Sequence, residues 1–590
     1  MFMSNQKMEN LLNLSLDATL EERLKAPDLN VGFNDTTDTW TIIIRYVKNL
    51  DILNQYSIEP TLLLGGYAIL EVPETLIEQI SALDEVIYVE KPKNLFFTVT
   101  EGRRTSCVSE IQNTVGANGN PASLSLFGSG CLVGIIDSGI DYSNPVFRNP
   151  DGSTRIIGIW DQTENGTPPA GYQIGAYYNE DQINEALQYE NPAEQQRIVR
   201  TQDLSGHGTA VASVAAGNFA PDRRNNLGMA TKSSILAVKL GNPYQKSFPR
   251  TSELMLAIDF MVRKGIELNM PLALNLSFGN SYGSHTGSSL LETYIDTAAS
   301  SGVTSIVIGT GNEGVASGHT SGRIQTGERD VIELSAAGYE TNLNIQIWKA
   351  YYDEMSFEVI SPQGNSFVIP SQGPAAYRYR MENTNLLIYY GEPNPYSIYQ
   401  EIYLDFLPEQ NYINAGLWQI IITGRRIVNG EYHLWLPVES ALNGSRFTMP
   451  SPYATLTIPS TSGKAISVGA YNPYNLSYAS FSGRGYDLSS AILRNMIKPD
   501  ISAPGVDITT AAAGGGFLLN SGTSIATPFV TGAAAIMMEW GIINGNDPFL
   551  YGEKLKAYLL NGAKPLTGFD EYPNPYVGWG RLCVKDSLPL

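Results

Sequence analysis

The chain has 590 residues, of which 43% are hydrophobic and 16% charged, as in ordinary soluble globular proteins and unlike disordered or fibrous ones. This length exceeds what one compact core holds, so about two to four domains are expected. Acidic residues outnumber basic ones by 58 to 38, for a net charge of -20, which argues against general nucleic-acid binding and against a polybasic membrane anchor.

The N-terminal stretch has polar residues early and lacks an apolar core followed by a small-residue cleavage site. We therefore expect no secretory signal peptide, and synthesis in the cytoplasm without export by the usual route. No uninterrupted apolar run is long enough to cross a bilayer, so no membrane span is expected.

Residues 39–92 have the pattern of a small independent unit. Alternating apolar runs, a Gly65-Gly66 break and one stretch of helical periodicity predict the order β-α-β-β-α-β. The expected elements are a strand at 39–47, a helix near 48–56, a hairpin at 62–72, a helix at 73–83 and a strand at 85–90. This order favours a ferredoxin-like sandwich. Residues 93–107 are expected to form an exposed linker.

From about residue 107, apolar strands alternate with helices, which predicts an α/β domain with a mostly parallel sheet. Residues 131–137, CLVGIID, are apolar throughout, as expected of a strand buried on both faces of a sheet. Further strands are expected at 271–279, 303–314, 464–472 and 508–514, and helices at 251–265, 289–302 and 527–540. In such a sheet, chemistry belongs at the carboxyl ends of the strands.

Residues 320–450 interrupt this rhythm with short, aromatic-rich, alternating runs separated by Gly, Pro and Asn turns. The pattern indicates an all-β sandwich or jelly roll. Because insertions are tolerated at surface loops, we interpret it as a β domain inserted into the α/β domain.

Three motifs stand at strand ends or helix starts. Asp137 ends the strand VGIID, His207 begins an alanine-rich helix in SGHGTAVAS, and Ser524 precedes another helix in SGTSIATP. Taken singly, the aspartate suits a turn, the histidine an ordinary polar contact and the serine a helix cap. Together they supply a nucleophile, a base that accepts its proton and a carboxylate that orients the base.

A fourth candidate is Asn312 in IGTGNEG, which follows another predicted strand. Its side-chain amide suits either a turn or hydrogen-bond donation to an oxyanion, and beside the other motifs we favour the oxyanion role. The remaining histidines, His285, His319 and His433, lie in loop-like or β-insert contexts and are interpreted as ordinary polar residues.

The three cysteines are an odd number in a long chain and lack CxxC spacing. We therefore predict no disulfide framework and no metal or redox site, and we expect Cys107, Cys131 and Cys583 to be buried structural thiols.

The motifs DSGID, GHGTAVAS, GNEG and GTSIATPFVTGAAA, in the chain order Asp, His, Ser, resemble those of the subtilisin-like serine proteases. The resemblance covers 107–320 and 455–590. It implies an endopeptidase whose triad is Asp137, His207 and Ser524, with Asn312 as oxyanion donor. It implies no cofactor, and since calcium loops do not map onto clear carboxylate clusters, calcium binding stays open. The residues that line the substrate cleft by resemblance are Ser277, Phe278, Gly279, Gly309, Thr310 and Gly311.

The N-terminal residues resemble the subtilase propeptide, which implies self-cleavage between Phe97 and Ser106. A subtilase without a leader and with a β insertion is similar to the clostridial Csp proteases, where the insert is a jelly roll and the cleaved prodomain stays bound. That resemblance implies a protein or peptide substrate, processing of a spore-cortex lytic zymogen during germination, and possible incorporation into the spore. Some Csp members have lost triad residues, so a catalytically silent or prodomain-inhibited signalling partner is the alternative.

The expected fold class is thus α/β, a subtilisin-like mostly parallel sheet flanked by helices, with a ferredoxin-like α+β prodomain and an inserted all-β jelly roll. The expected domains are the prodomain at 1–100, the catalytic domain at 101–320 and 453–590, and the insert at 321–452.

Overall fold

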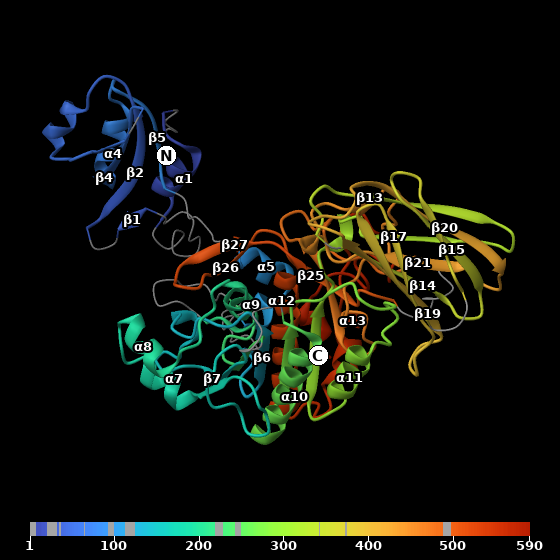
Figure 1. Ribbon diagram of the computed structural model, residues 1–590. Helices are drawn as coiled ribbons and strands as arrows, with labels where there is room; N and C mark the ends of the chain where they lie inside the picture. Colours follow the sequence, from blue (N-terminus) through green and yellow to red (C-terminus); the bar gives the residue numbers. More distant parts are fainter. Residues whose placement is uncertain are drawn as a thin grey trace. The chain divides into compact units, whose positions relative to one another are not determined.

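The structure is a computed structural model (Figure 1). It describes residues 7–19, 32–34, 37–63, 65–92, 99–112, 124–218, 228–241, 249–341, 343–371, 375–487 and 497–589. The chain forms two compact units, Met1–Phe97 and Thr98–Leu590.

The first unit is the predicted ferredoxin-like sandwich. Its antiparallel sheet has the order β5-β2-β4-β3, and β1 also pairs with β2. Trp40, Ile42 and Ile44 alternate along β2 and are buried beneath the helices. The elements are α1 (Asn10–Asp17), β1 (Phe33–Asn34), β2 (Thr39–Tyr46), η1 (Asp51–Tyr56), β3 (Thr61–Leu63), β4 (Tyr67–Pro73), α4 (Glu74–Ser81) and β5 (Val86–Glu90). The predicted first helix is only the six-residue 3₁₀ turn η1.

The second unit is built on a nine-stranded sheet with the order β24-β23-β11-β10-β6-β9-β7-β8, in which β25 also pairs with β23. Neighbours pair in parallel except β7 with β8 and β23 with β24. The strands are β6 (Leu132–Asp137), β7 (Ile156–Asp161), β8 (Ala176–Asn179), β9 (Ser234–Lys239), β10 (Leu272–Leu276), β11 (Thr304–Gly309), β23 (Ile466–Asn472), β24 (Ser477–Tyr478) and β25 (Ile501–Pro504).

Helices cover both faces of this sheet, which explains its uniformly apolar central strands. Along β6, Val133 and Ile135 pack in the core formed with α9 (His207–Ala216) and α12 (Thr523–Met538). Leu132 and Ile136 point the other way, into the core formed with α10 (Thr251–Leu268) and α11 (Leu290–Ala299). Peripheral helices are α7 (Glu180–Ala186), α8 (Pro192–Ile198) and α13 (Gly552–Asn561).

One helix has the length and composition of a membrane span among the described residues. It comprises Thr523–Ile543, and 89% of its most apolar window is buried inside the protein. This span is α12 together with its continuation to Ile543, and it is a core helix packed against the sheet.

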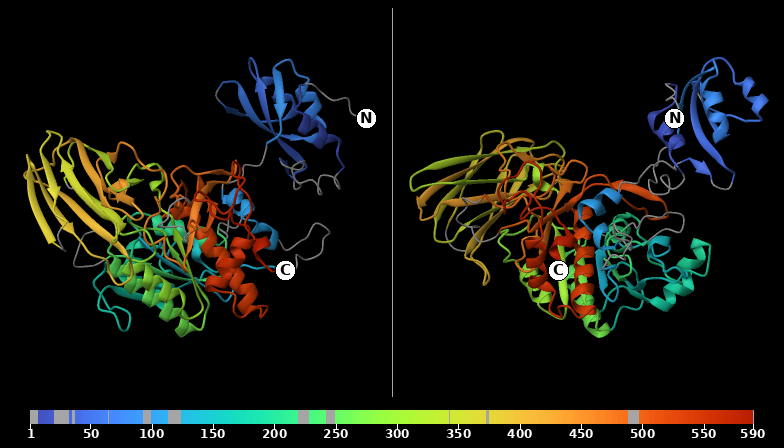
Figure 2. Two further views of the ribbon diagram at one scale, coloured as in Figure 1. Left: turned by 90° about the vertical axis from the view of Figure 1, so that its right-hand side faces the viewer. Right: turned by 180° about the vertical axis from the view of Figure 1, so that it is seen from behind.

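The inserted β domain is confirmed as two antiparallel sheets around a shared core, and Figure 2 shows its strands beside the helices and sheet of the catalytic part. One sheet has the order β12-β21-β14-β19-β18-β17 and the other β16-β15-β20-β13-β22. The strands are β12 (His319–Arg323), β13 (Arg329–Ala336), β14 (Leu343–Ala350), β15 (Glu354–Ile360), β16 (Ser366–Ile369), β17 (Ala375–Met381), β18 (Thr384–Tyr390), β19 (Tyr399–Pro408), β20 (Gly416–Arg426), β21 (Glu431–Trp435) and β22 (Arg446–Phe447).

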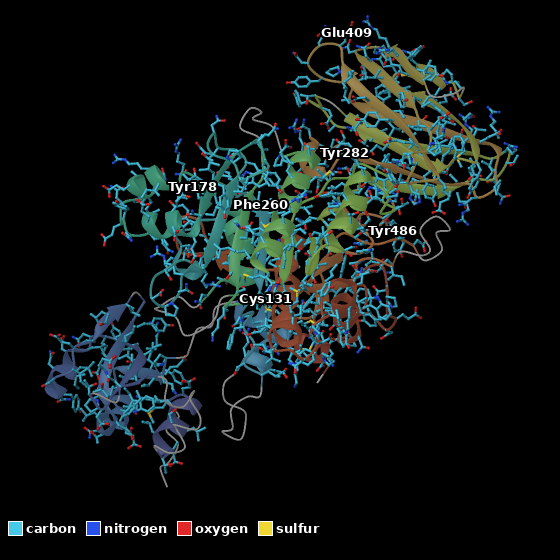
Figure 3. All side chains as sticks on the ribbon, turned by 90° about the horizontal axis from the view of Figure 1, so that it is seen from below. Cys131, Tyr178, Phe260, Tyr282, Glu409 and Tyr486 are labelled. Carbon is cyan, nitrogen blue, oxygen red and sulfur yellow. A yellow bond between two sulfur atoms is a disulfide. The ribbon has the colours of Figure 1, made fainter. Side chains whose placement is uncertain are left out.

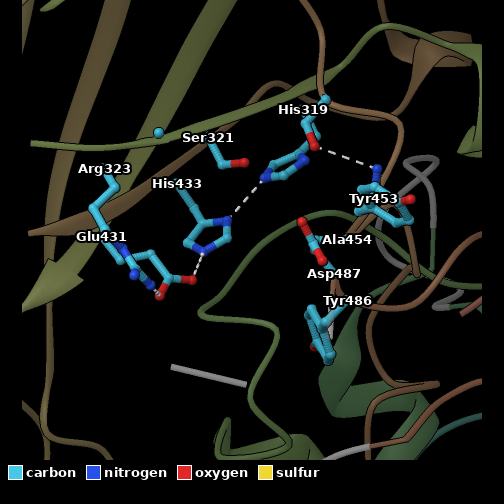
Figure 4. Close-up of a pocket in the computed structure, with 11 residues that line it drawn as sticks. His319, Ser321, Arg323, Glu431, His433, Tyr453, Ala454, Tyr486 and Asp487 are labelled. Atoms are coloured by element: carbon cyan, nitrogen blue, oxygen red, sulfur yellow. Dashed lines mark hydrogen bonds and ion pairs between the residues drawn. The ribbon is translucent and has the colours of Figure 1, made fainter. Parts of the chain in front are cut away.

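The insert is joined to the catalytic part by polar contacts and stacked rings. Tyr282, on the loop after β10, accepts a hydrogen bond from Asn344 at 3.3 Å where the two parts meet (Figure 3). His285, on the same loop, stacks on Trp435 with ring centroids 4.2 Å apart. His319 and His433 of the insert stack beside Trp435, and their Nε2 and Nδ1 atoms lie 3.1 Å apart (Figure 4). The three histidines that were interpreted from sequence as ordinary polar residues therefore form one cluster.

Two further sequence predictions, on the linker and on the cysteines, were wrong. The segment 93–107, expected to be an exposed linker, contains α5 (Val99–Thr105), where Gly102 and Arg103 are buried, while 93–98 lie outside the described residues. Cys107 and Cys583 form a disulfide across 476 residues. The two cysteines meet because α5 and α6 (Ser109–Gln112) fold together with the C-terminal α14 (Val584–Ser587). Cys131 is the buried free thiol that was predicted.

Candidate active site

The sheet topology brings three candidate segments to one edge. β6, β10 and β11 are adjacent and parallel, with Ile136, Leu276 and Ile308 in register. The residues that follow these strands therefore emerge together at their carboxyl ends, where α/β sheets place their ligands.

Asp137 and His207 form the first functional pair. Asp137 Oδ1 lies 2.6 Å from His207 Nδ1 and also accepts a hydrogen bond from Ser138 N–H at 2.7 Å. The aspartate side chain is 3% exposed, whereas the histidine side chain is 40% exposed. A buried carboxylate thus fixes the ring of a solvent-accessible imidazole and leaves Nε2 for chemistry.

Glycine at position 208 permits this pairing. A Cβ there would lie 2.1 Å from the carbonyl oxygen of Gly139 and 3.1 Å from the Asp137 side chain. The first turn of α9 can therefore pack against the end of β6 only without a side chain at this position.

Asp203 was not singled out from the sequence, yet its carboxylate organises the loop before His207. It accepts hydrogen bonds from Gly206 N–H at 3.0 Å, Thr209 N–H at 2.8 Å and Ser138 Oγ at 2.9 Å. Burial lowers the pKa of His207, but the charge and hydrogen bond of Asp137 and the charge of Asp203 outweigh it, so the pKa is raised above its usual value.

Ser524 is the second residue of α12, rather than its cap, which is Gly522. The residue four positions later is Pro528, which has no N–H to donate to the Ser524 carbonyl. Ser277 Oγ donates to that carbonyl instead, at 3.1 Å, and Asn275 Nδ2 donates to Ser277 Oγ at 2.8 Å. The end of β10 thereby holds the backbone of Ser524 in place.

Asn312 has its amide oriented by α12. Its Oδ1 accepts hydrogen bonds from the backbone N–H and hydroxyl of Thr523, at 3.0 and 3.2 Å. Because Oδ1 faces Thr523, the other amide atom, Nδ2, points away from it. Nδ2 lies near Gly522 and Ser524: a Cβ built on Gly522 would be 3.6 Å from Asn312 Nδ2 and 3.1 Å from Ser524 Oγ. The amide donor and the serine hydroxyl therefore flank the same small space.

These residues surround one cavity of about 320 Å³. His207, Asn312 and Ser524 line it, as do the predicted residues Ser277, Phe278, Gly279, Gly309 and Gly311. The side chain of Thr310 is instead fully buried and lies 3.5 Å from Ser482 Oγ. The lining residues that the sequence interpretation missed are Glu313, Val438, Glu439, Ser440, Thr457 and Thr523.

No group of three or more His, Cys, Asp or Glu side chains converges as metal ligands within the described ranges of the chain. The arrangement around the cavity is suited to nucleophilic attack on a carbonyl group, with hydrogen-bond donors beside the nucleophile.

Comparison with known proteins agrees with this geometry. Residues 128–357 and 428–580 match the model of the Subtilase family, and residues 6–93 match that of the Csp protease B prodomain. The chain belongs to the subtilase family of serine proteases.

Among solved structures, this subtilase is similar to the CspB protease of Clostridium perfringens, with 36% identity and a TM-score of 0.74 over 82% of this chain and 96% of that one. Serine protease AprX of Bacillus subtilis is 32% identical over 23% of this chain and 32% of its own length. The PII-type proteinase of Lacticaseibacillus paracasei is 24% identical over 78% of this chain and 26% of its own. The chain thus spans about a third or less of these two curated relatives.

Proposed function

We propose that this subtilase hydrolyses peptide bonds with Ser524 as nucleophile, His207 as general base and Asp137 as its orienting carboxylate. The observation that carries the proposal is the 2.6 Å Asp137–His207 contact beside a cavity that His207, Asn312 and Ser524 line together. A binding protein has no need of this combination.

In the first half-reaction, Ser524 Oγ bonds to the substrate carbonyl carbon while its proton passes to His207 Nε2. The carbonyl oxygen gains the negative charge and accepts hydrogen bonds from Asn312 Nδ2 and the Ser524 N–H at the start of α12. His207 then gives the proton to the leaving nitrogen, and the C–N bond breaks. Water, deprotonated by His207, attacks the acyl-enzyme, and its proton returns to Ser524 Oγ as the acid leaves.

Self-cleavage of the N-terminal unit is part of the proposal. The compact units divide between Phe97 and Thr98, and a Cβ on Gly102 would lie 2.6 Å from the ring of Phe529 in the core. Because the chain from Gly102 onward is built into the catalytic part, we place the scissile bond before Gly102, at the early end of the expected 97–106 segment.

The physiological role follows the similarity to the Clostridium perfringens CspB protease. We propose a protein zymogen such as a spore-cortex lytic enzyme as substrate, cytoplasmic synthesis followed by incorporation into the spore, and a cleaved prodomain that stays non-covalently bound. We propose that catalysis needs no cofactor. The alternative is a subtilase that the prodomain keeps inhibited and that acts as a signalling partner.

Comparison of wild-type chain with Ser524→Ala tests the proposal. Intact mass and N-terminal sequencing should show a new N-terminus before Gly102 in the wild type and an uncut chain in the variant. Ser521→Ala is the matched control, because Ser521 is exposed, lies three residues upstream and bonds to Asp507 rather than lining the cavity. An uncut wild type, or processing in Ser524→Ala, would contradict self-cleavage.

A further inference from the structure

The inserted β domain contributes directly to the candidate active site. After β21, the chain turns back toward the catalytic part through the 3₁₀ turn η4 (Glu439–Ala441). Val438, Glu439 and Ser440 line the same cavity as Ser524. The insert therefore forms part of the wall that a substrate meets.

An acidic pair lies where the two parts meet. Glu313, which follows Asn312, accepts a hydrogen bond from the backbone N–H of Glu439 through Oε2 at 3.0 Å. Burial raises the pKa of Glu313, and the negative charge of Glu439 raises it further, whereas the hydrogen bond from the Glu439 N–H lowers it. A bound cation would offset the repulsion between the two negative charges.

The described part of the cavity offers no lysine or arginine to this pair. None of the ion pairs between described residues includes Glu313 or Glu439. Of the described lining residues, His207 alone is basic, and it pairs with Asp137. The charge is therefore available to a bound substrate.

The walls beside Ser524 suit a slender, unbranched side chain. Gly279 and Gly311 face Thr457 so closely that a Cβ on them would lie 2.6 and 2.5 Å, respectively, from Thr457 Oγ1. Backbone thus forms both sides, Thr457 joins them, and Glu313 and the solvent-exposed Glu439 belong to the same lining.

We propose that Glu313 and the insert's Glu439 make this protease select Lys or Arg as the residue whose carbonyl Ser524 attacks, and reject Asp or Glu there. The inference rests on the proposed function and adds the substrate class to it. The β insert is then a specificity element of the catalytic site as well as an appended domain.

Fluorogenic peptides that differ only in the residue before the scissile bond, Lys, Gln or Glu, test the selection. The wild type should cleave the Lys peptide about tenfold better than the Gln peptide by kcat/KM, and the Glu peptide least. Glu313→Gln and Glu439→Gln should each lower the Lys-to-Gln ratio about fivefold or more. Glu392→Gln, the same change at an exposed site on the insert, should leave the ratio unchanged.

Self-processing gives a second readout that does not require the prodomain to leave. The residue before the mature N-terminus is replaced with Lys, Gln or Glu, and cleavage is followed during cell-free synthesis. In the wild type, the rate of self-cleavage should fall from Lys to Gln to Glu. In Glu439→Gln, the three rates should be more nearly equal. Equal rates for Lys and Gln, or an unchanged ratio in both acidic-pair variants, would overturn the proposal. Loss of all cleavage together with unreactive Ser524 would instead overturn the proposed function.

Discussion

The histidine cluster at the junction of the insert predicts a specific loss of stability in acid. His285 is 1% exposed, and its Nδ1 and Nε2 lie 2.8 Å from the Leu456 carbonyl and 3.2 Å from the Ser281 carbonyl. Burial lowers its pKa to about 4, the two carbonyls oppose the shift, and the charge of His433 adds to it.

The sign and size follow from linkage. The folded pKa of about 4 lies below the unfolded value of 6.5, so the unfolded chain takes up more protons. The stability from a neutral His285 is present above pH 6.5 and is lost as the pH falls toward 4. Between about pH 7 and about pH 5 the loss from this residue alone is about 2 kcal/mol.

Urea unfolding of Ser524→Ala, with and without His285→Gln, measures this loss, because the serine change prevents self-digestion. The free energy of unfolding should fall between about pH 7 and about pH 5 by about 2 kcal/mol more in the protein with His285 than in the one without. Burial also lowers the pKa of His319, as do His433 and His285, so His319→Gln should reduce the acid loss too. Parallel pH dependences with and without His285 would refute the reasoning.

Three further predictions concern the site and the termini. Asn312→Ala should lower kcat by about two to three orders of magnitude with little change in KM, in peptide hydrolysis; an unchanged kcat would remove Asn312 from the oxyanion site. Because the pKa of His207 is raised and its neutral form is the base, kcat/KM should fall as the pH drops through a midpoint above 6.5, and a midpoint well below that would contradict the Asp137–His207 pairing. The denatured, unreduced chain should show one reactive thiol, that of Cys131, whereas three would contradict the Cys107–Cys583 disulfide.

The catalytic candidates were predictable from sequence because their chemistry needs compact local motifs. Glycines beside His207 and Ser524 and a strand that ends in Asp137 are visible within a few residues. The strands of the first unit and of the insert were likewise predictable, because apolar and polar residues alternate along them with a period of two. The register of β6, β10 and β11 then brings Asp137 and the residues that follow β10 and β11 to one edge of the sheet.

What sequence could not predict depends on contacts between distant segments. Glu439 reaches the cavity from the far end of an insert, and Glu313 is recognisable only as its partner, 126 residues away. The Cys107–Cys583 bond spans 476 residues, and an odd cysteine count obscured it. Similarly, His285 reads as a loop residue until Trp435 is placed against it.

The reactivity of Ser524 tests the account most directly. The purified chain is treated with a serine-directed fluorophosphonate, and the site of modification is located by peptide mass spectrometry. We predict one adduct, on Ser524, that is lost in His207→Ala and unaffected in Ser521→Ala. An unmodified Ser524 in processed chain from which the prodomain has been stripped, or equal labelling when His207 is removed, would contradict the assignment of these residues as nucleophile and base.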